Sequence, residues 1–416
     1  MVLLSKIKYV LTTVFICILL SVIGYALPTN TIFKQHVAKS AYILDGEGTY
    51  PKVLSLYNSQ LDNFTDALMI NIAAYDGGES LLTKLSSNYR YKTSQESSIS
   101  WLLTAYSKHD EPISVAPYSR YWHGYIPFVK LALFFTTYQG IRQINAILQI
   151  LVFAVILTLL IKRNKALFVL PYTILWISLN PSAIQLSMQF SSIYYVFSIA
   201  IILLLYNFEK IRTTPGYGVF FMLIGIVTSW LDFLTYPILT LGIPLTILML
   251  LDDSTSGEKL KICISTALMW SFGYFGMWAF KWIISSLVLK QNVIGQAMQT
   301  AAFRTSSSYD GETWTKLQVL FKNIAHFKHF SFYLLFLITP TYSFIKIIKE
   351  HRTPYFTDGI LFCGIAFMPI AWYIVLSNHS YIHDFFTFRS LGVSIFALSC
   401  FFINLTEHTE VKKWKK

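Results

Sequence analysis

Charged side chains are scarce in this sequence, at 13% of 416 residues, whereas a soluble domain carries about 25%. Apolar residues make up 54%, and the mean hydropathy is +0.52. This balance excludes an ordinary soluble domain. The net charge of +12 does not predict nucleic acid as a partner, because the basic residues stand in short clusters between apolar runs and not on one amphipathic face.

Cysteines are also few and have no paired spacing. Cys17, Cys263, Cys363 and Cys400 all fall inside apolar stretches, which supports neither a disulfide framework nor a thiolate metal site. The sequence lacks internal repeats, a GxxxxGK[ST] loop, a GxSxG elbow and an HExxH helix. Common soluble enzyme chemistries are therefore unsupported.

Apolar runs, in contrast, are abundant. A membrane span needs about 17–25 residues, and ten runs approach that length: 8–27, 141–161, 166–181, 189–207, 217–234, 236–251, 262–285, 331–349, 357–377 and 390–405. The sequence therefore predicts an all-α polytopic membrane protein, with residues 1–416 as a single membrane domain of about ten transmembrane helices. The first run exceeds a usual signal-peptide core, so we expect a retained helix.

Basic clusters between the runs predict the orientation. Short Lys/Arg-rich loops stay in the cytoplasm, and the clusters all lie on one side if the N-terminus is inside: 162–165, 209–212, 258–261, 346–352 and 412–416. We expect a multi-pass protein of the plasma membrane with both termini cytoplasmic. Residues 28–140 then form a large extracytoplasmic loop, and 286–330 a second outer loop. The segments 182–188, 229–237 and 378–389 face the same outer side.

The first outer loop has its own pattern. Residues 55–74 show helical apolar spacing, whereas 76–98 are rich in Ser, Gly and Tyr and look irregular. The apolar piece 125–138 is too short to span comfortably and contains Lys130, so we interpret it as an interfacial or re-entrant helix. We expect a folded cap and not a linker.

Two acids of this loop, Asp62 and Asp66, stand four residues apart and would share one face of a helix. Such a pair can act as a general base or bind a cation, because a partly desolvated acid beside another acid has a raised pKa. The alternative is an exposed amphipathic helix with solvated charges.

An aromatic stretch, Arg120, Tyr121, Trp122 and His123, precedes the predicted interfacial helix. Trp and Tyr are expected as headgroup-level anchors in any membrane protein. Arg120 could in addition pair with a phosphate and His123 donate to a substrate.

Further polar candidates lie at the outer ends of later runs. Asp232 stands beside a Pro-containing turn, where a carboxylate is costly and often functional, although it could be an ordinary turn residue. Lys281, Arg304 and Arg389 could converge on one phosphate, although a lysine there could also simply snorkel. Asn378, His379 and His383 suit substrate hydrogen bonding, plain loop structure or, less readily, a metal site, since no third ligand is evident. A divalent metal is therefore possible but unassigned.

The chain resembles the GT-C superfamily of integral membrane glycosyltransferases in four features. These are the first helix, the outer loop that carries Asp62 and Asp66, the segment after Tyr121-Trp122-His123-Gly124, and the outward polar motifs. The resemblance implies a carboxylate base in the first outer loop and a polyprenyl-phosphate-linked or other lipid-linked sugar donor. The acid pair departs from the family pattern because it lies about 35 residues beyond the first helix.

The resemblance leads us to expect an inverting membrane glycosyltransferase that acts at the outer face on a cell-envelope glycan or lipid acceptor. Its base would be Asp66 or Asp62, with a lipid-linked sugar donor as partner and no nucleic acid. A transporter or flippase for lipid-linked saccharides is the alternative, although no repeat supports it. A polysaccharide polymerase or ligase would share the same outward site.

Overall fold

The computed structural model describes residues 2–54, 57–107, 111–351, 354, 356 and 358–407. The basic tail 412–416 and Arg352, both used in the topology argument, lie outside these residues. α-Helices dominate the described chain, and its strands form two short antiparallel pairs, β1 (Arg90–Lys92) with β2 (Ser114–Ala116) and β3 (Ser308–Tyr309) with β4 (Glu312–Thr313).

Each of the ten apolar runs coincides with a helix: α1 (Val2–Ala26), α7 (Tyr138–Lys162), α8 (Val169–Ser178), α10 (Met188–Thr213), α11 (Tyr217–Leu231), α12 (Leu239–Leu251), α13 (Ser256–Leu289), α16 (Phe330–Lys349), α17 (Gly359–Val375) and α20 (Gly392–Glu407). Six described helical segments are long and apolar enough to cross a membrane, and they include α1, α7, α10, α13, α16 and α20. The protein is therefore an all-α membrane protein. The helices α8, α11, α12 and α17 are shorter.

α11 and α13 approach each other closely. A Cβ atom on Gly273 would lie 2.2 Å from the carbonyl oxygen of Met222, so only glycine fits at this crossing. Small residues at such contacts are typical of membrane helices, whose backbones approach closely to gain van der Waals contact. One turn on, Trp270 and Tyr274 stack with ring centroids 4.8 Å apart. Farther along α13, Phe275, Trp278 and Trp282 form one wall of the site described below.

The first loop is folded around its own apolar core. It contains α2 (Thr31–Glu47), α3 (Asn63–Ala74), α4 (Leu81–Ser87), α5 (Ser98–Tyr106) and α6 (Ile126–Phe135). Phe33, Leu44, Ile72, Leu102 and Leu133 are among the buried members of this core. Two local expectations were wrong: the helix predicted from residue 55 begins at Asn63, and the segment 76–98, expected to be irregular, contains α4 and β1.

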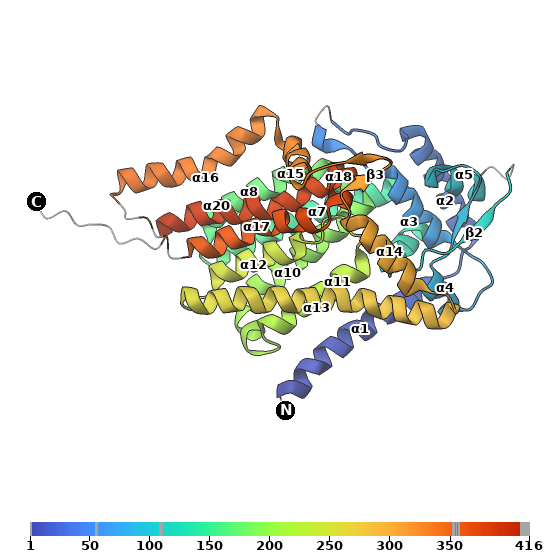
Figure 1. Ribbon diagram of the computed structural model, residues 1–416, viewed down its shortest axis with the longest axis horizontal. Helices are drawn as coiled ribbons and strands as arrows, with labels where there is room; N and C mark the ends of the chain where they lie inside the picture. Colours follow the sequence, from blue (N-terminus) through green and yellow to red (C-terminus); the bar gives the residue numbers. More distant parts are fainter. Residues whose placement is uncertain are drawn as a thin grey trace, which may run out of the picture.

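Figure 1 shows α2 to α5 gathered at one end of the molecule, with α14 (Val293–Thr305), β3 and α18 (Ser377–Ile382) beside them. The long helices α13, α17 and α20 run lengthwise away from that end. The remaining helices are short: η1 (Tyr57–Ser59), η2 (Ala166–Phe168), α9 (Pro181–Leu186), α15 (Lys316–Ile324), η3 (Ala325–Phe327), α19 (Asp384–Thr387) and η4 (Phe388–Leu391). The segments predicted to face outward thus share one end of the fold.

Candidate functional site

Asp62 and Asp66 lie at the start of α3, and both are buried. Asp62 is the N-cap: its carboxylate accepts from the backbone N–H of Thr65 at 3.0 Å and from the Thr65 hydroxyl at 2.8 Å. Burial raises the pKa of Asp62 to about 7, and the charge of Asp66 adds to the rise. A group with this pKa is poised for proton transfer, although Asp62 is only 4% exposed.

Asp66 is engaged more fully. Its carboxylate accepts from the Tyr138 hydroxyl at 2.5 Å and from the backbone N–H groups of Met188 and Gln189, both at 3.0 Å. The last two donors belong to the first turn of α10, where a negative charge satisfies unpaired N–H groups and the helix dipole. Burial raises the pKa of Asp66, and the hydrogen bond from Tyr138 opposes that rise. Asp66 thus joins the first loop to α7 and α10.

Arg142 completes this connection from α7. Its guanidinium forms a bidentate ion pair with Glu47, at 2.5 and 2.9 Å, and donates to the carbonyl of Leu186 at 2.8 Å and to Asn63 at 3.3 Å. We call Asp66, Tyr138, Arg142, Glu47 and Asn63 the Asp66 network. The catalytic role assigned to Asp66 and Asp62 stays a prediction; in the structure their carboxylates cap helices.

The expected convergence of Lys281, Arg304 and Arg389 on one phosphate is wrong. The Lys281 ammonium, 1% exposed, donates to the carbonyl of Leu85 at 2.5 Å and to Oδ1 of Asn88 at 2.6 Å, at the end of α4. The Arg389 guanidinium donates to the carbonyls of residues 179 and 385. Lys281 and Arg389 thus donate to groups at the ends of two different helices, with Nη2 of Arg389 left without a described partner, whereas Arg304 lines a cavity.

The stretch 118–125 is fixed against α11 and α13 by aromatic side chains. The indole of Trp282 donates to the carbonyl of Arg120 at 2.9 Å, and the indole of Trp122 donates to that of Met277 at 2.7 Å. Gly124 donates its N–H to the carbonyl of Trp230 at 2.8 Å, and a Cβ there would come within 2.4 Å of the Trp230 ring. Trp122 is therefore a packing residue here.

His123 is also held within this stretch. It is 1% exposed, with Nε2 against the carbonyl of Tyr118 at 3.1 Å and Nδ1 against the hydroxyl of Tyr125 at 3.0 Å. A carbonyl only accepts, so we assign the proton to Nε2, and Nδ1 accepts from Tyr125. Burial, followed by the nearby Lys281, holds the pKa of His123 well below its usual range. His123 is a neutral, fully bonded side chain in this conformation.

Asp232 stands in a tight turn after α11. Its carboxylate accepts from the backbone N–H of Leu234 at 2.8 Å and from the N–H and hydroxyl of Thr235. Burial raises the pKa of Asp232 to about 6. Leu234 has φ +71°, a left-handed conformation that is uncommon for a branched residue. Such strain persists only where the surroundings enforce it, and it clusters at functional sites.

His379 holds the other side of the same turn. Its Nε2 lies 2.6 Å from the carbonyl of Leu234, so Nε2 is the donor and Nδ1 is free to accept. Nδ1 is buried and has no hydrogen-bond partner in the described chain. Asn378 donates to the carbonyl of Ser308 at 2.8 Å, and its Oδ1 is likewise buried without a described partner. Two acceptor atoms are thus unused next to the turn.

His383 contacts Arg304. Its Nε2 lies 2.9 Å from an Arg304 nitrogen, which can only donate, so His383 is the acceptor and neutral. Burial, aided by Arg304, lowers the pKa of His383 to about 3. The His379 and His383 rings are 4.9 Å apart, but across the described residues no group of three or more His, Cys, Asp or Glu side chains could hold a metal ion.

A cavity of about 250 Å³ lies against this turn. Its walls come from the 118–125 stretch, the 232–237 turn, α13, α14 and α17, and they are mostly apolar: Phe275, Trp278, Trp282, Ala297, Trp372 and Leu376. The indole nitrogens of Trp278 and Trp372 are buried without a described hydrogen-bond partner. An aromatic cavity with unused donors fits a ligand that is largely apolar and carries acceptor atoms.

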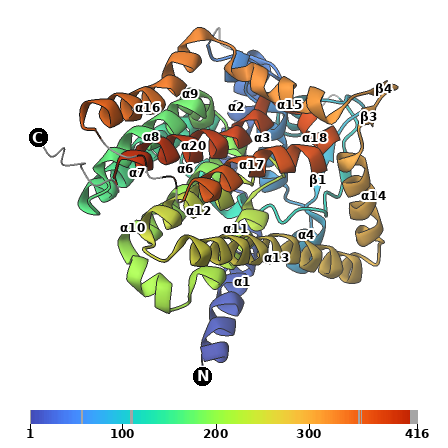
Figure 2. The ribbon, with the colours of Figure 1, turned by 60° about the vertical axis from the view of Figure 1, so that its left-hand side comes forward.

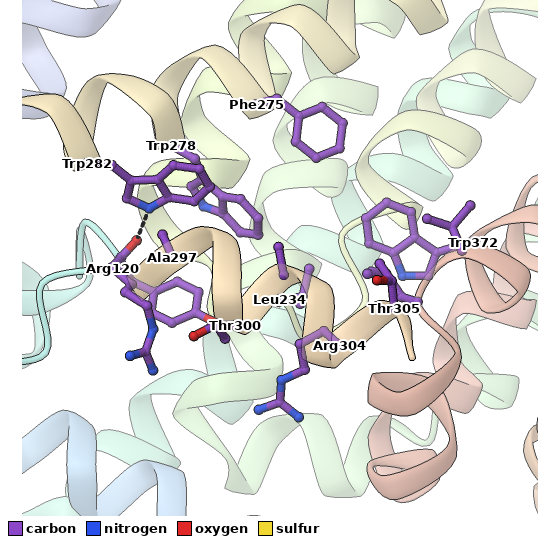
Figure 3. A pocket seen from close by; sticks show the side chains of 14 residues that line it. Arg120, Leu234, Phe275, Trp278, Trp282, Ala297, Thr300, Arg304, Thr305 and Trp372 are labelled. Carbon is purple, nitrogen blue, oxygen red and sulfur yellow. Dashed lines mark hydrogen bonds between the residues drawn. The ribbon is translucent and has the colours of Figure 1, made fainter. Parts of the chain in front are cut away.

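Two arginines line the same cavity, Arg120 and Arg304. In Figure 3 both guanidinium groups lie on the side away from Phe275. Neither arginine forms an ion pair with a carboxylate in the described chain, and both Nε atoms are buried without a partner. Burial raises the pKa of Tyr121. The charges of Arg304 and Arg120 oppose this rise, and the charge of Asp232 adds to it. Tyr121 therefore interacts electrostatically with both cations and with Asp232.

A third arginine adds to the positive charge. Arg90 on β1 lies over the Tyr118 ring at 4.5 Å, and Arg120 lies over the same ring at 5.3 Å. Burial lowers the pKa of Arg90, and the charge of Arg120 lowers it further. Like charges held together without a counter-ion repel, and an anion would relieve that repulsion. We call Arg120, Arg304, Tyr121 and the aromatic walls the arginine cavity.

Of the predicted residues, the fold brings together Arg120, Tyr121, Asp232, Arg304, His379 and His383. Arg90 and Trp372 were missed, because neither stands in an unusual local pattern. Comparison with known proteins adds no assignment: no family, curated protein or solved structure matches the chain.

Proposed function

We propose that this protein is a membrane glycosyltransferase that moves a sugar from a polyprenyl-phosphate-linked donor to an acceptor hydroxyl at the outer face of the membrane. The observation that carries the proposal is the arginine cavity. It combines two guanidinium groups that lack a carboxylate partner in the described chain with walls of Phe and Trp. A lipid phosphate complements both features, since it carries an anion and a long apolar chain.

In this proposal the donor phosphate lies between Arg120 and Arg304, and the first isoprenoid units pack against Phe275, Trp278 and Trp372. Guanidinium groups suit this role because their planar forks bind phosphate oxygens in pairs and stay charged. They act mainly as the bond breaks, when charge accumulates on the departing phosphate.

The reaction balances without a redox partner. The acceptor hydroxyl oxygen attacks the anomeric carbon, the bond from that carbon to the phosphate oxygen breaks, and the electron pair leaves with the phosphate. Asp232 receives the acceptor proton. It accepts a hydrogen bond from Leu234, which lines the cavity, and its pKa of about 6 leaves it mostly ionised at neutral pH.

Asp62 and Asp66 take a positioning role here, because both carboxylates cap helices away from the turn that lines the cavity. The unpaired acceptor atoms, Nδ1 of His379 and Oδ1 of Asn378, suit hydrogen bonds from sugar hydroxyls. A flippase would need the same phosphate contacts but no base.

Binding of a polyprenyl phosphate to purified protein in nanodiscs tests the phosphate site. We expect Arg120→Ala combined with Arg304→Ala to weaken binding on the order of tenfold or more, since charge-assisted hydrogen bonds to phosphate are among the stronger polar contacts. Arg212→Ala is the matched control, an exposed arginine far from the cavity in the chain.

Equal binding by the double variant and the control would refute the phosphate site. If binding weakens as expected, Asp232→Asn separates the two functions: it should abolish sugar transfer and leave lipid-phosphate binding intact. Undiminished transfer by Asp232→Asn would remove this residue as the base.

A further inference from the structure

A second hollow lies between α1, α10 and α11, and the proposed transferase chemistry does not use it. It is a groove that encloses about 430 Å³. Its walls are formed mainly by apolar side chains of α10 and α11: Val196, Ile199, Ala200, Leu203, Leu223 and Val227. Figure 2 shows α1 leaving the body of the fold toward its N-terminus, below α11 and α13.

The groove extends along most of α10. Along α10 its lining runs from Tyr195 to Ile211, which corresponds to roughly 24 Å at the rise of an α-helix. The hydrocarbon layer of one leaflet is about 15 Å thick, so the groove is long enough for one acyl chain of a lipid. α10 is irregular at Asn207, with φ −114° and ψ 26°, and this kink lines the groove near one end.

Lipid is the apolar material available to fill the groove. α1 and α10 both have the length and hydropathy of membrane spans, and only 17% of the apolar window of α1 is buried inside the protein. α1 contributes Tyr9 and Thr13 to the lining. The open side therefore faces hydrocarbon if these helices cross the bilayer.

Positive charge gathers at the end of the groove near the kink. Lys210 lines this end together with Asn207 and Thr214. The Lys6 ammonium from α1 reaches the same place, 4.0 Å from where a Cβ on Gly216 would stand. Neither lysine forms an ion pair in the described chain. Two ammonium groups at one end of an apolar groove complement an anionic headgroup.

We propose that this groove is a binding site for an anionic glycerophospholipid, with one acyl chain between α1 and α10 and the headgroup phosphate at Lys6 and Lys210. The site is independent of the transferase proposal, since it shares no lining residue with the arginine cavity. Bound lipid fills the space between α1 and the rest of the bundle.

Native mass spectrometry of delipidated protein, with added phosphatidylglycerol or phosphatidylcholine, tests this site. We expect the wild type to retain one phosphatidylglycerol in preference to phosphatidylcholine. A lysine near an anionic headgroup favours binding about fivefold, so Lys6→Gln with Lys210→Gln should lower phosphatidylglycerol retention roughly 25-fold. The control is Lys8→Gln with Lys162→Gln, two exposed lysines outside the groove lining.

A groove-filling variant tests the apolar part separately. Thr13→Trp should displace phosphatidylglycerol while Lys6 and Lys210 remain, and Thr13 is half-buried, so the change does not disturb the core. Equal retention of the two lipids by the wild type, retention by the double variant that matches the control, or undiminished retention by Thr13→Trp would each overturn the proposal.

Discussion

The Asp66 network and the arginine cavity both contain charged side chains, yet the polar atoms of the two regions differ in how fully they are hydrogen-bonded. In the Asp66 network, Asp66, Tyr138, Arg142 and Glu47 each have protein partners. In the arginine cavity, Arg120 and Arg304 have no carboxylate partner in the described chain, and their Nε atoms are unpaired. A satisfied network stabilises a fold, whereas unsatisfied donors beside a cavity indicate a ligand.

The difference also reverses an inference from the acids alone. Asp66 has a raised pKa and lies in the outer loop, as a base would, but four donors surround it. A perturbed pKa is shared by catalytic and structural carboxylates. Asp232 is also buried and hydrogen-bonded, but it holds the turn whose Leu234 lines the arginine cavity, and this position favours it as the base.

The largest effect should come from Asp66→Asn. The amide directs an NH₂ group at donors that now bind a carboxylate, so the free energy of unfolding should fall by about 3 kcal/mol. Thermal unfolding in detergent measures this change, with Asp45→Asn, an exposed acid, as the control. A variant that unfolds at the wild-type temperature but has lost transfer would instead identify Asp66 as the base and break the comparison.

Arg304→Ala should act on function and not on stability. Removing a cation that stabilises the departing phosphate costs on the order of 100-fold in turnover, whereas Arg304 caps no helix and is only partly buried. Turnover of a lipid-linked sugar and the unfolding temperature should be measured together. Arg304→Lys should recover part of the turnover. A fall in the unfolding temperature comparable to that of Asp66→Asn would show that the arginine cavity, too, is mainly structural.

Asp62 should make stability depend on pH. Its pKa is about 7 in the folded protein, raised by burial from 3.8. Below about pH 4, Asp62 is protonated in both the folded and the unfolded protein. Between about pH 4 and about pH 7 only the unfolded chain has lost the proton, so the free energy of unfolding falls as pH rises. It levels off above about pH 7. Each pH unit corresponds to about 1.4 kcal/mol at most.

Asp62→Asn keeps a capping oxygen and removes the titration. Its unfolding temperature should therefore fall less than that of the wild type between about pH 5 and about pH 8. Parallel curves for the two proteins would show that Asp62 is not buried as a neutral acid.

Single-cysteine labelling perturbs the protein least, and it tests whether the first loop and the β3 segment face the same side of the membrane. Ser94→Cys in the first loop and Ser308→Cys on β3 are exposed positions, and both should react with an impermeant thiol reagent on intact cells. Thr213→Cys is exposed at the C-terminal end of α10, far from the first turn that binds Asp66, and should be protected. The background should lack the four native cysteines. Labelling of Thr213→Cys but not of the other two would invert the orientation.

The sequence by itself determined the helices. Apolar runs of about 20 residues must satisfy their backbone groups internally in lipid, and only a helix does so within one segment. All ten runs are helical for this reason. The folded first loop was less predictable, since β1 is held by hydrogen bonds to α3 and β2, and α4 by hydrogen bonds to α13, more than by local pattern.

Only the tertiary structure decided which polar residues act together. Lys281, Arg304 and Arg389 looked equivalent in the sequence, as cations at the outer ends of apolar segments. Their partners come from chain segments far away, such as the end of α4 for Lys281 and the end of α8 for Arg389. A hydrogen bond forms only when donor and acceptor lie about 3 Å apart and are well aligned. The packing of helices that are distant in the sequence sets these distances and angles. Local pattern therefore identified the charged residues, and the packing left Arg304 beside Arg120 with nitrogens still to be satisfied.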